Sequence, residues 1–132
     1  MKIEHIGIAV KNIEESKKVF DSLFGFSSYK EETVESENVL TVFYKTGESK
    51  IELLQSTVED GIISKYIAKK GEGMHHIAFA VDDIFSEMKR LTDEGFQLLN
   101  AEPKPGADNK LICFLHPKNT NGVLIELCQE IK

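Results

Sequence analysis

The start of the chain alternates apolar and polar positions and then changes to a helical period. Residues 3–10 alternate, as expected for a β-strand with one buried face. Over residues 13–23 the apolar side chains recur at helical spacing, and Gly25 follows as a stop signal. Asn12 can cap this helix, with Glu15 three residues on as its reciprocal partner. The pattern predicts a strand followed by an amphipathic helix.

The remaining elements follow from the same reasoning. Three strands are predicted after the first helix, over residues 27–34, 38–45 and 49–56, with the KTGES segment as a hairpin turn between the last two. A short amphipathic helix is expected near residues 60–70. The later elements are predicted to be a strand over 74–81, a helix from Asp83 to Glu94, and strands near 96–102, 110–116 and 122–129.

The two series of elements are related by an internal duplication. The segment that begins at His5, HIGIAVKNIEESKKVF, aligns with the segment that begins at His76, HIAFAVDDIFSEMKRL. This alignment pairs the two histidines. KIELLQ aligns with LIELCQ, which pairs Glu52 with Glu126 and also matches their terminal glutamines. The separation from histidine to glutamate is 47 residues in the first copy and 50 in the second. Two matched segments in the same order indicate a repeated module.

The duplication predicts an α+β fold of two tandem β-α-β-β-β modules that together form a cupped mixed sheet. The chain is expected to be a single domain over residues 1–132. Module one covers about 1–57, the linker helix about 60–70, and module two about 73–132.

Composition narrows the class of protein. The 132 residues suit one domain, and 41% hydrophobic with 29% charged residues is typical of a soluble globular protein. The net charge of −6 argues against nucleic acid as a partner. No apolar run approaches the roughly 18 residues of a membrane span. Cys113 and Cys128 lie in apolar strand-like runs, so we expect reduced core residues in a cytoplasmic protein.

Two histidines and two glutamates at duplicated positions are the candidate chemistry. One interpretation makes the glutamates ordinary solvent-facing residues and the histidines hydrogen-bonded core residues. The other follows from the duplication: if the modules pack with pseudo-two-fold symmetry, the four side chains converge. Two imidazoles and two carboxylates without a thiolate suit a divalent Mn, Co, Ni, Fe or Zn ion with positions open to substrate. The predicted ligands are His5, Glu52, His76 and Glu126. His75, next to His76, is the weaker candidate. The alignment with His5 selects His76, and His75 points to the other face of the strand.

The chain resembles the vicinal oxygen chelate superfamily, the glyoxalase and bleomycin-resistance fold, over essentially its whole length. Within that superfamily, GMHHIAFAVDDI (residues 73–84) and FLHPKNTNGVLIELCQ (residues 114–129) are similar to methylmalonyl-CoA epimerases. The Asp-Pro-Asp/Asn-Gly segment usual in glyoxalase I is absent. The resemblance implies the same four metal ligands that the duplication indicates.

The resemblance also implies a reaction: metal-dependent proton transfer next to a carbonyl. The preferred reaction is epimerisation of a 2-carboxyacyl-CoA such as methylmalonyl-CoA. The alternative is a glyoxalase I-type lactoylglutathione lyase acting on the hemithioacetal of methylglyoxal and glutathione. A glutamate at position 52 slightly favours the glyoxalase I-type alternative, because some epimerases have glutamine at that position. A non-catalytic binding protein is a third interpretation, but such members generally lack the metal ligands.

The base and the partners complete the prediction. Glu126 is expected to be the catalytic base as well as a ligand. A described epimerase uses a glutamate on the second strand of its first module, where this chain offers Leu40 or Thr41. The expected partners are a small-molecule thioester or thiol-adduct substrate and a second copy of the chain in a homodimer, with neither nucleic acid nor membrane.

Overall fold

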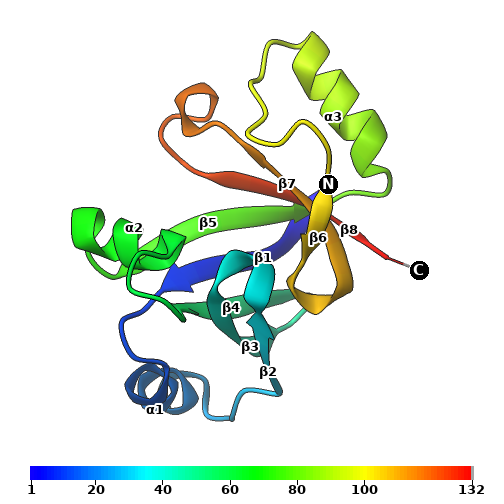
Figure 1. The fold of residues 1–132 in the computed structure, drawn as a ribbon. Helices are drawn as coiled ribbons and strands as arrows, with labels where there is room; N and C mark the ends of the chain where they lie inside the picture. Colours follow the sequence, from blue (N-terminus) through cyan, green and yellow to red (C-terminus); the bar gives the residue numbers. More distant parts are fainter. Residues whose placement is uncertain (132) are drawn as a thin grey trace. The chain divides into compact units, whose positions relative to one another are not determined.

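The computed structural model describes residues 1–131, drawn as a ribbon in Figure 1. The chain consists of two compact units. One unit is Ile6–His75. The other combines Met1–His5 with the chain from His76 onward. The unit boundaries therefore fall inside the first strand, β1 (Lys2–Ala9), and inside the fifth, β5 (Gly73–Ala80).

The Ile6–His75 unit contains the first helix, the next three strands and the linker helix. Its strands follow the order β2-β3-β4-β1, and β3 pairs antiparallel with both β2 and β4. The bounds of its elements are α1 (Ile13–Phe24), β2 (Lys30–Val34), a 3-10 turn (Glu35–Glu37), β3 (Val39–Thr46), β4 (Ser49–Ser56) and α2 (Ile62–Lys70).

The unit formed by Met1–His5 and the chain from His76 contains the same order of a helix followed by three strands, and these strands are shorter. Its strands follow the order β5-β8-β7-β6, in which β5 and β8 are parallel and the other pairs antiparallel, so the sheet is mixed. The bounds of its elements are α3 (Ile84–Asp93), β6 (Lys104–Gly106), β7 (Lys110–Leu115), β8 (Ile125–Glu130) and the 3-10 turns Ala107–Asn109 and Pro117–Asn119. Within residues 1–131, every helix is too short or too polar to cross a bilayer.

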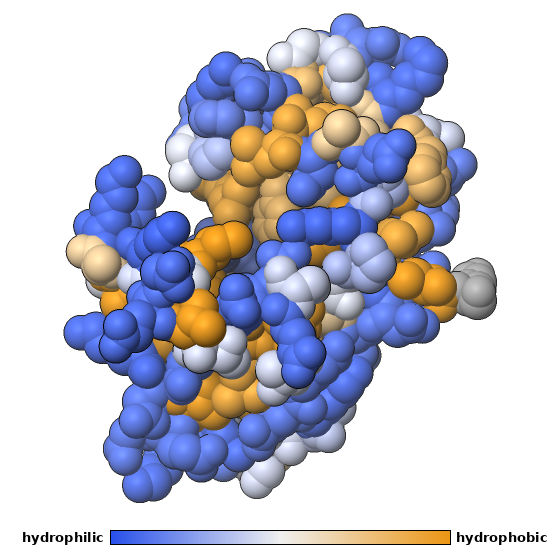
Figure 2. All heavy atoms as spheres, viewed as in Figure 1, coloured by the Kyte–Doolittle hydropathy of each residue, from blue (hydrophilic) through white to orange (hydrophobic). Residues whose placement is uncertain are grey.

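Each unit buries one face of its sheet under a helix. In the Ile6–His75 unit, α1 packs on the face that carries Val42, Tyr44 and Leu53. In the other unit, Ile84 and its helical neighbours pack on Leu127 and the face around it. The outer surface of α3 is formed mostly by hydrophilic side chains, as the upper right of Figure 2 shows. Both cysteines are buried free thiols, as predicted.

The predicted helix ends are confirmed in α1. The Asn12 side chain accepts a hydrogen bond from the Glu15 backbone N–H at 3.0 Å. Gly25 ends the helix with a φ of 79°, in the left-handed region that favours glycine. In α3, the side chain of Asp83 caps the backbone N–H groups of Phe85 and Ser86.

The duplicated glutamines have the same structural role in both units. The Gln55 side-chain oxygen accepts a hydrogen bond from the Ile13 N–H at 2.6 Å. The Gln129 oxygen accepts one from the Ile84 N–H at 2.7 Å. The first N–H groups of a helix have no partner within it, so each glutamine ties the end of its module's last strand to the start of that module's helix.

Replacing Gln129 with alanine is expected to lower the free energy of unfolding by about 1–2 kcal/mol, because it leaves a partly buried N–H without its acceptor. Chemical denaturation followed by circular dichroism measures this loss. Gln97→Ala is the control, because Gln97 is exposed and its replacement should change stability by less than about 0.5 kcal/mol. Equal stability of the two variants would contradict the capping role.

The strand predicted over residues 96–102 is wrong for most of its length. Only a single bridge forms there, between Leu98 and Leu115. The Asn100 side-chain oxygen then accepts from the Phe114 N–H at 2.9 Å, the donor that a continued ladder would have used. Pairing with β7 resumes at β6, after Pro103.

Candidate functional site

Both duplicated glutamates lie on the sheet face opposite their module's helix. Leu53 and Leu127 pack under α1 and α3, and because side chains alternate along a strand, Glu52 and Glu126 point to the other side. Their exposed fractions are 4% and 5%. The interpretation of these residues as solvent-facing glutamates is therefore wrong.

Three of the four predicted ligands converge within the unit formed by Met1–His5 and the chain from His76. The Nε2 atoms of His5 and His76 are 3.0 Å apart. The Glu126 carboxylate lies 3.6 Å from the first of these nitrogens and 3.3 Å from the second. All three side chains are buried, and their ligand-type atoms lie within 4.8 Å of one another.

The chemistry of this donor set fits a divalent cation. Two imidazole nitrogens and a carboxylate oxygen are ligands that first-row divalent metals accept, and the absence of a thiolate among them leaves the choice of metal open. Two imidazole nitrogens directed at each other at 3.0 Å form a hydrogen bond only when one carries a proton. A shared cation would bind both lone pairs at once.

His5 reaches this group in a defined orientation. Its other ring nitrogen, Nδ1, lies 2.8 Å from a carboxylate oxygen of Glu4. A carboxylate accepts hydrogen bonds, so Nδ1 carries the hydrogen and Nε2 presents the lone pair in the neutral ring. The duplication could not predict this contact, since Glu4 is not part of the repeat.

Apolar residues flank Glu126 on the two neighbouring strands. The strand registers put Ala78 beside it on β5 and Phe114 directly opposite it on β7. The Phe114 ring lies edge-on to His76, with ring centroids 5.8 Å apart. In the other unit, Phe43 is likewise directly opposite Glu52. A phenylalanine facing each glutamate is a feature of the repeat that the sequence reasoning missed.

Glu52 lies within the Ile6–His75 unit, on β4. Thr41 faces the same side of the sheet from β3 and is 1% exposed. Glu32 lies directly opposite Thr41 on β2, with its side chain 31% exposed and 3.4 Å from the Lys30 ammonium. At Leu40 and Thr41 on β3 this chain has no glutamate, but Glu32 supplies a carboxylate on the neighbouring strand β2. Glu52 as the fourth ligand stays a prediction.

His75 has a different environment from His76. Its ring stands perpendicular to the Tyr66 ring, with centroids 4.9 Å apart. Burial lowers the pKa of His75 to about 4, so the ring is neutral at physiological pH. It is absent from the ligand-type groups found among residues 1–131.

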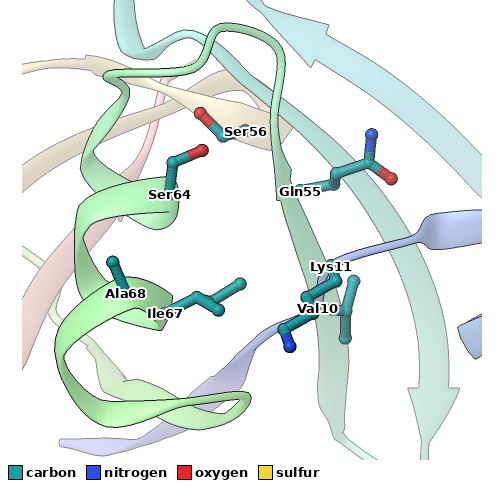
Figure 3. A pocket seen from close by; sticks show the side chains of 7 residues that line it. All are labelled: Val10, Lys11, Gln55, Ser56, Ser64, Ile67 and Ala68. Carbon is teal, nitrogen blue, oxygen red and sulfur yellow. The ribbon is translucent and has the colours of Figure 1, made fainter.

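A separate pocket of about 270 Å³ lies between α2 and the end of β4 within the Ile6–His75 unit (Figure 3). Gln55 and Ser56 line one side, and Ser64 and Ile67 line the helical side. The two serine hydroxyls both donate to the Val58 carbonyl, at 2.7 and 3.1 Å. None of the predicted site residues lines this pocket, so it is distinct from the His5–His76–Glu126 group.

Comparison with known proteins identifies the family. The sequence model of the Glyoxalase/Bleomycin resistance protein/Dioxygenase superfamily matches residues 4–114. The chain is 37% identical over 127 residues to the mitochondrial methylmalonyl-CoA epimerase of Dictyostelium discoideum, covering 96% of this chain and 76% of that protein. It is 34% identical over 130 residues to the ethylmalonyl-CoA/methylmalonyl-CoA epimerase of Cereibacter sphaeroides, covering 97% of each.

A solved structure supports the same relationship. The Streptomyces coelicolor methylmalonyl-CoA epimerase in complex with 2-nitronate-propionyl-CoA matches with a TM-score of 0.92 and 34% identity, covering 100% of this chain and 99% of that one. The predicted α+β fold of two tandem β-α-β-β-β modules is confirmed. The chain belongs to the Glyoxalase/Bleomycin resistance protein/Dioxygenase superfamily.

Proposed function

We propose that this protein is an epimerase that inverts the 2-position of a 2-carboxyacyl-CoA such as methylmalonyl-CoA. The observation that carries the proposal is the buried group of His5, His76 and Glu126 in a chain that aligns over nearly its full length with methylmalonyl-CoA epimerases. The substrate is a small-molecule thioester. A homodimer in the cytoplasm is part of the same proposal.

Four residues would hold one divalent metal ion: His5, Glu52, His76 and Glu126. The donor set accommodates Co, Ni, Mn, Fe or Zn without selecting among them. When bound, the ion supplies Lewis-acid stabilisation of the negative charge that develops on substrate oxygens as the proton leaves. The duplication is the support for including Glu52, together with its burial on the helix-free face of its sheet.

Glu126 is the residue that moves the proton in this proposal. One of its carboxylate oxygens accepts the proton from the carbon between the thioester and the substrate carboxylate. Inversion requires a second proton donor on the opposite face of that carbon, and Glu126 then releases its proton to the solvent. Phe114 and Ala78 flank Glu126 and limit the access of water to it, so its oxygens are available to the substrate.

A deuterium-exchange experiment tests the function. Protein reloaded with Co²⁺ or Ni²⁺ is incubated in D₂O with methylmalonyl-CoA or with the glutathione hemithioacetal of methylglyoxal, and each is followed by NMR. We expect exchange at the 2-position of methylmalonyl-CoA and no formation of lactoylglutathione. Turnover of the hemithioacetal alone would replace the epimerase with the glyoxalase I-type alternative.

A further inference from the structure

Only one of the two duplicated histidines is preceded by a carboxylate. Glu4 stands before His5, whereas the residue before His76 is His75, which contacts the Tyr66 ring. The Glu4 oxygen is 2.8 Å from His5 Nδ1, and the two side chains are 12% and 6% exposed. The internal symmetry of the sequence is therefore broken at the position next to the site.

The contact fixes how His5 presents its other nitrogen. An ionised carboxylate offers only acceptors, so His5 Nδ1 is the donor and Nε2 carries the lone pair. That lone pair faces the His76 Nε2 at 3.0 Å and the Glu126 carboxylate at 3.6 Å. A carboxylate hydrogen-bonded to the far nitrogen of an imidazole also makes the near nitrogen a stronger ligand.

We infer that Glu4 is a positioning residue that holds His5 in the Nδ1–H tautomer and aims its Nε2 into the site. The inference rests on the proposed function only in taking His5 as a metal ligand. A carboxylate that is only 12% exposed loses most of its hydration, and the His5 N–H provides a hydrogen-bond partner that offsets this cost. The two modules then contribute unequally: His5 is oriented by a carboxylate of its own strand, and His76 packs against Phe114.

A competing arrangement involves the thiol on β8. Glu4, His5 and Cys128 also offer ligand atoms within 4.8 Å of one another. If a metal bound there, Glu4 would be a ligand and not a positioning residue. Co²⁺ distinguishes the two arrangements, because coordination by a thiolate adds an intense near-ultraviolet absorption that nitrogen and oxygen ligands lack.

The test combines a metal-free and a metal-bound measurement. In ¹H–¹⁵N spectra of the metal-free protein, His5 should be the Nδ1–H tautomer, and Glu4→Ala should convert it to a mixture. The Co²⁺ affinity, measured by competition with a chelator, should fall about 10–100-fold in Glu4→Ala and less in Glu4→Gln, whose amide oxygen can still accept the hydrogen bond. Glu130→Gln is the control, because Glu130 is exposed and should leave the affinity unchanged.

Three results would overturn the inference. They are an Nε2–H tautomer for His5 in the parent protein, an unchanged Co²⁺ affinity in Glu4→Ala, and a thiolate absorption band that disappears in Cys128→Ala. Failure of the proposed function is distinguishable from these: a protein that shows the tautomer change but does not exchange methylmalonyl-CoA retains Glu4 as a positioning residue and loses only the assigned reaction.

Discussion

His76→Ala is expected to abolish the binding of one equivalent of Co²⁺ to protein previously treated with a chelator. The substitution removes one of two imidazoles whose Nε2 atoms are 3.0 Å apart, and leaves the Glu126 carboxylate with His5 alone in that group. Loss of a direct ligand should exceed the 10–100-fold loss in affinity that is typical when an orienting partner is removed. Isothermal titration calorimetry and the visible spectrum of bound Co²⁺ measure the effect.

His75→Ala is the matched control for this prediction. The two histidines are adjacent in the sequence, but His75 contacts the Tyr66 ring and lies outside the His5–His76–Glu126 group. Its replacement should leave the stoichiometry of Co²⁺ binding at one. Metal binding that survives His76→Ala and disappears in His75→Ala would show that the assignment of the ligand within the pair is wrong.

Glu126→Gln is expected to keep much of the metal affinity and lose most of the epimerisation rate. The amide oxygen can still coordinate a cation, but an amide does not accept a proton at neutral pH. General-base catalysis typically contributes roughly 10²–10⁴-fold, so a loss of that order is expected in kcat. Circular dichroism of the substrate as its 2-position is inverted measures the epimerisation rate. A Co²⁺ titration of the same protein sample measures the metal affinity.

Glu52→Gln is the comparison for the duplicated carboxylate. It should keep substantial activity, because the resemblance to methylmalonyl-CoA epimerases includes some members with glutamine at that position. Equal losses in the two variants would mean that both carboxylates share the proton transfer or act only through the metal. A larger loss at Glu52 would move the proton transfer to the first module.

The duplication in the sequence was enough to predict the main features of the fold. Matched strand and helix periods predicted two β-α-β-β-β modules, and the cap and stop residues of α1 predicted its ends to within a residue. These features depend on local spacing, which the sequence displays directly. The strand over residues 96–102 was wrong because the Asn100 side chain competes with the backbone for the Phe114 N–H, and an alternating pattern does not reveal such competition.

The sequence also selected which residue types to consider at the site, because a histidine and a glutamate recur in each copy. It could not tell a buried glutamate from a solvent-facing one, since alternation in a strand indicates opposite faces but not which face is covered. The packing of α1 and α3 decided that question by covering the leucine faces. Strand pairing then brought Phe114 opposite Glu126.

The contact between Glu4 and His5 was likewise decided by the tertiary structure. Adjacent residues on a strand ordinarily point to opposite faces, so the sequence pattern does not predict a contact between them. The distances among His5, His76 and Glu126 depend on residues 71 and 121 positions apart, which only the packed chain brings together. Sequence by itself determined the modules and the candidate residues, and long-range packing determined which of those residues meet, because side-chain convergence depends on register and burial between distant segments.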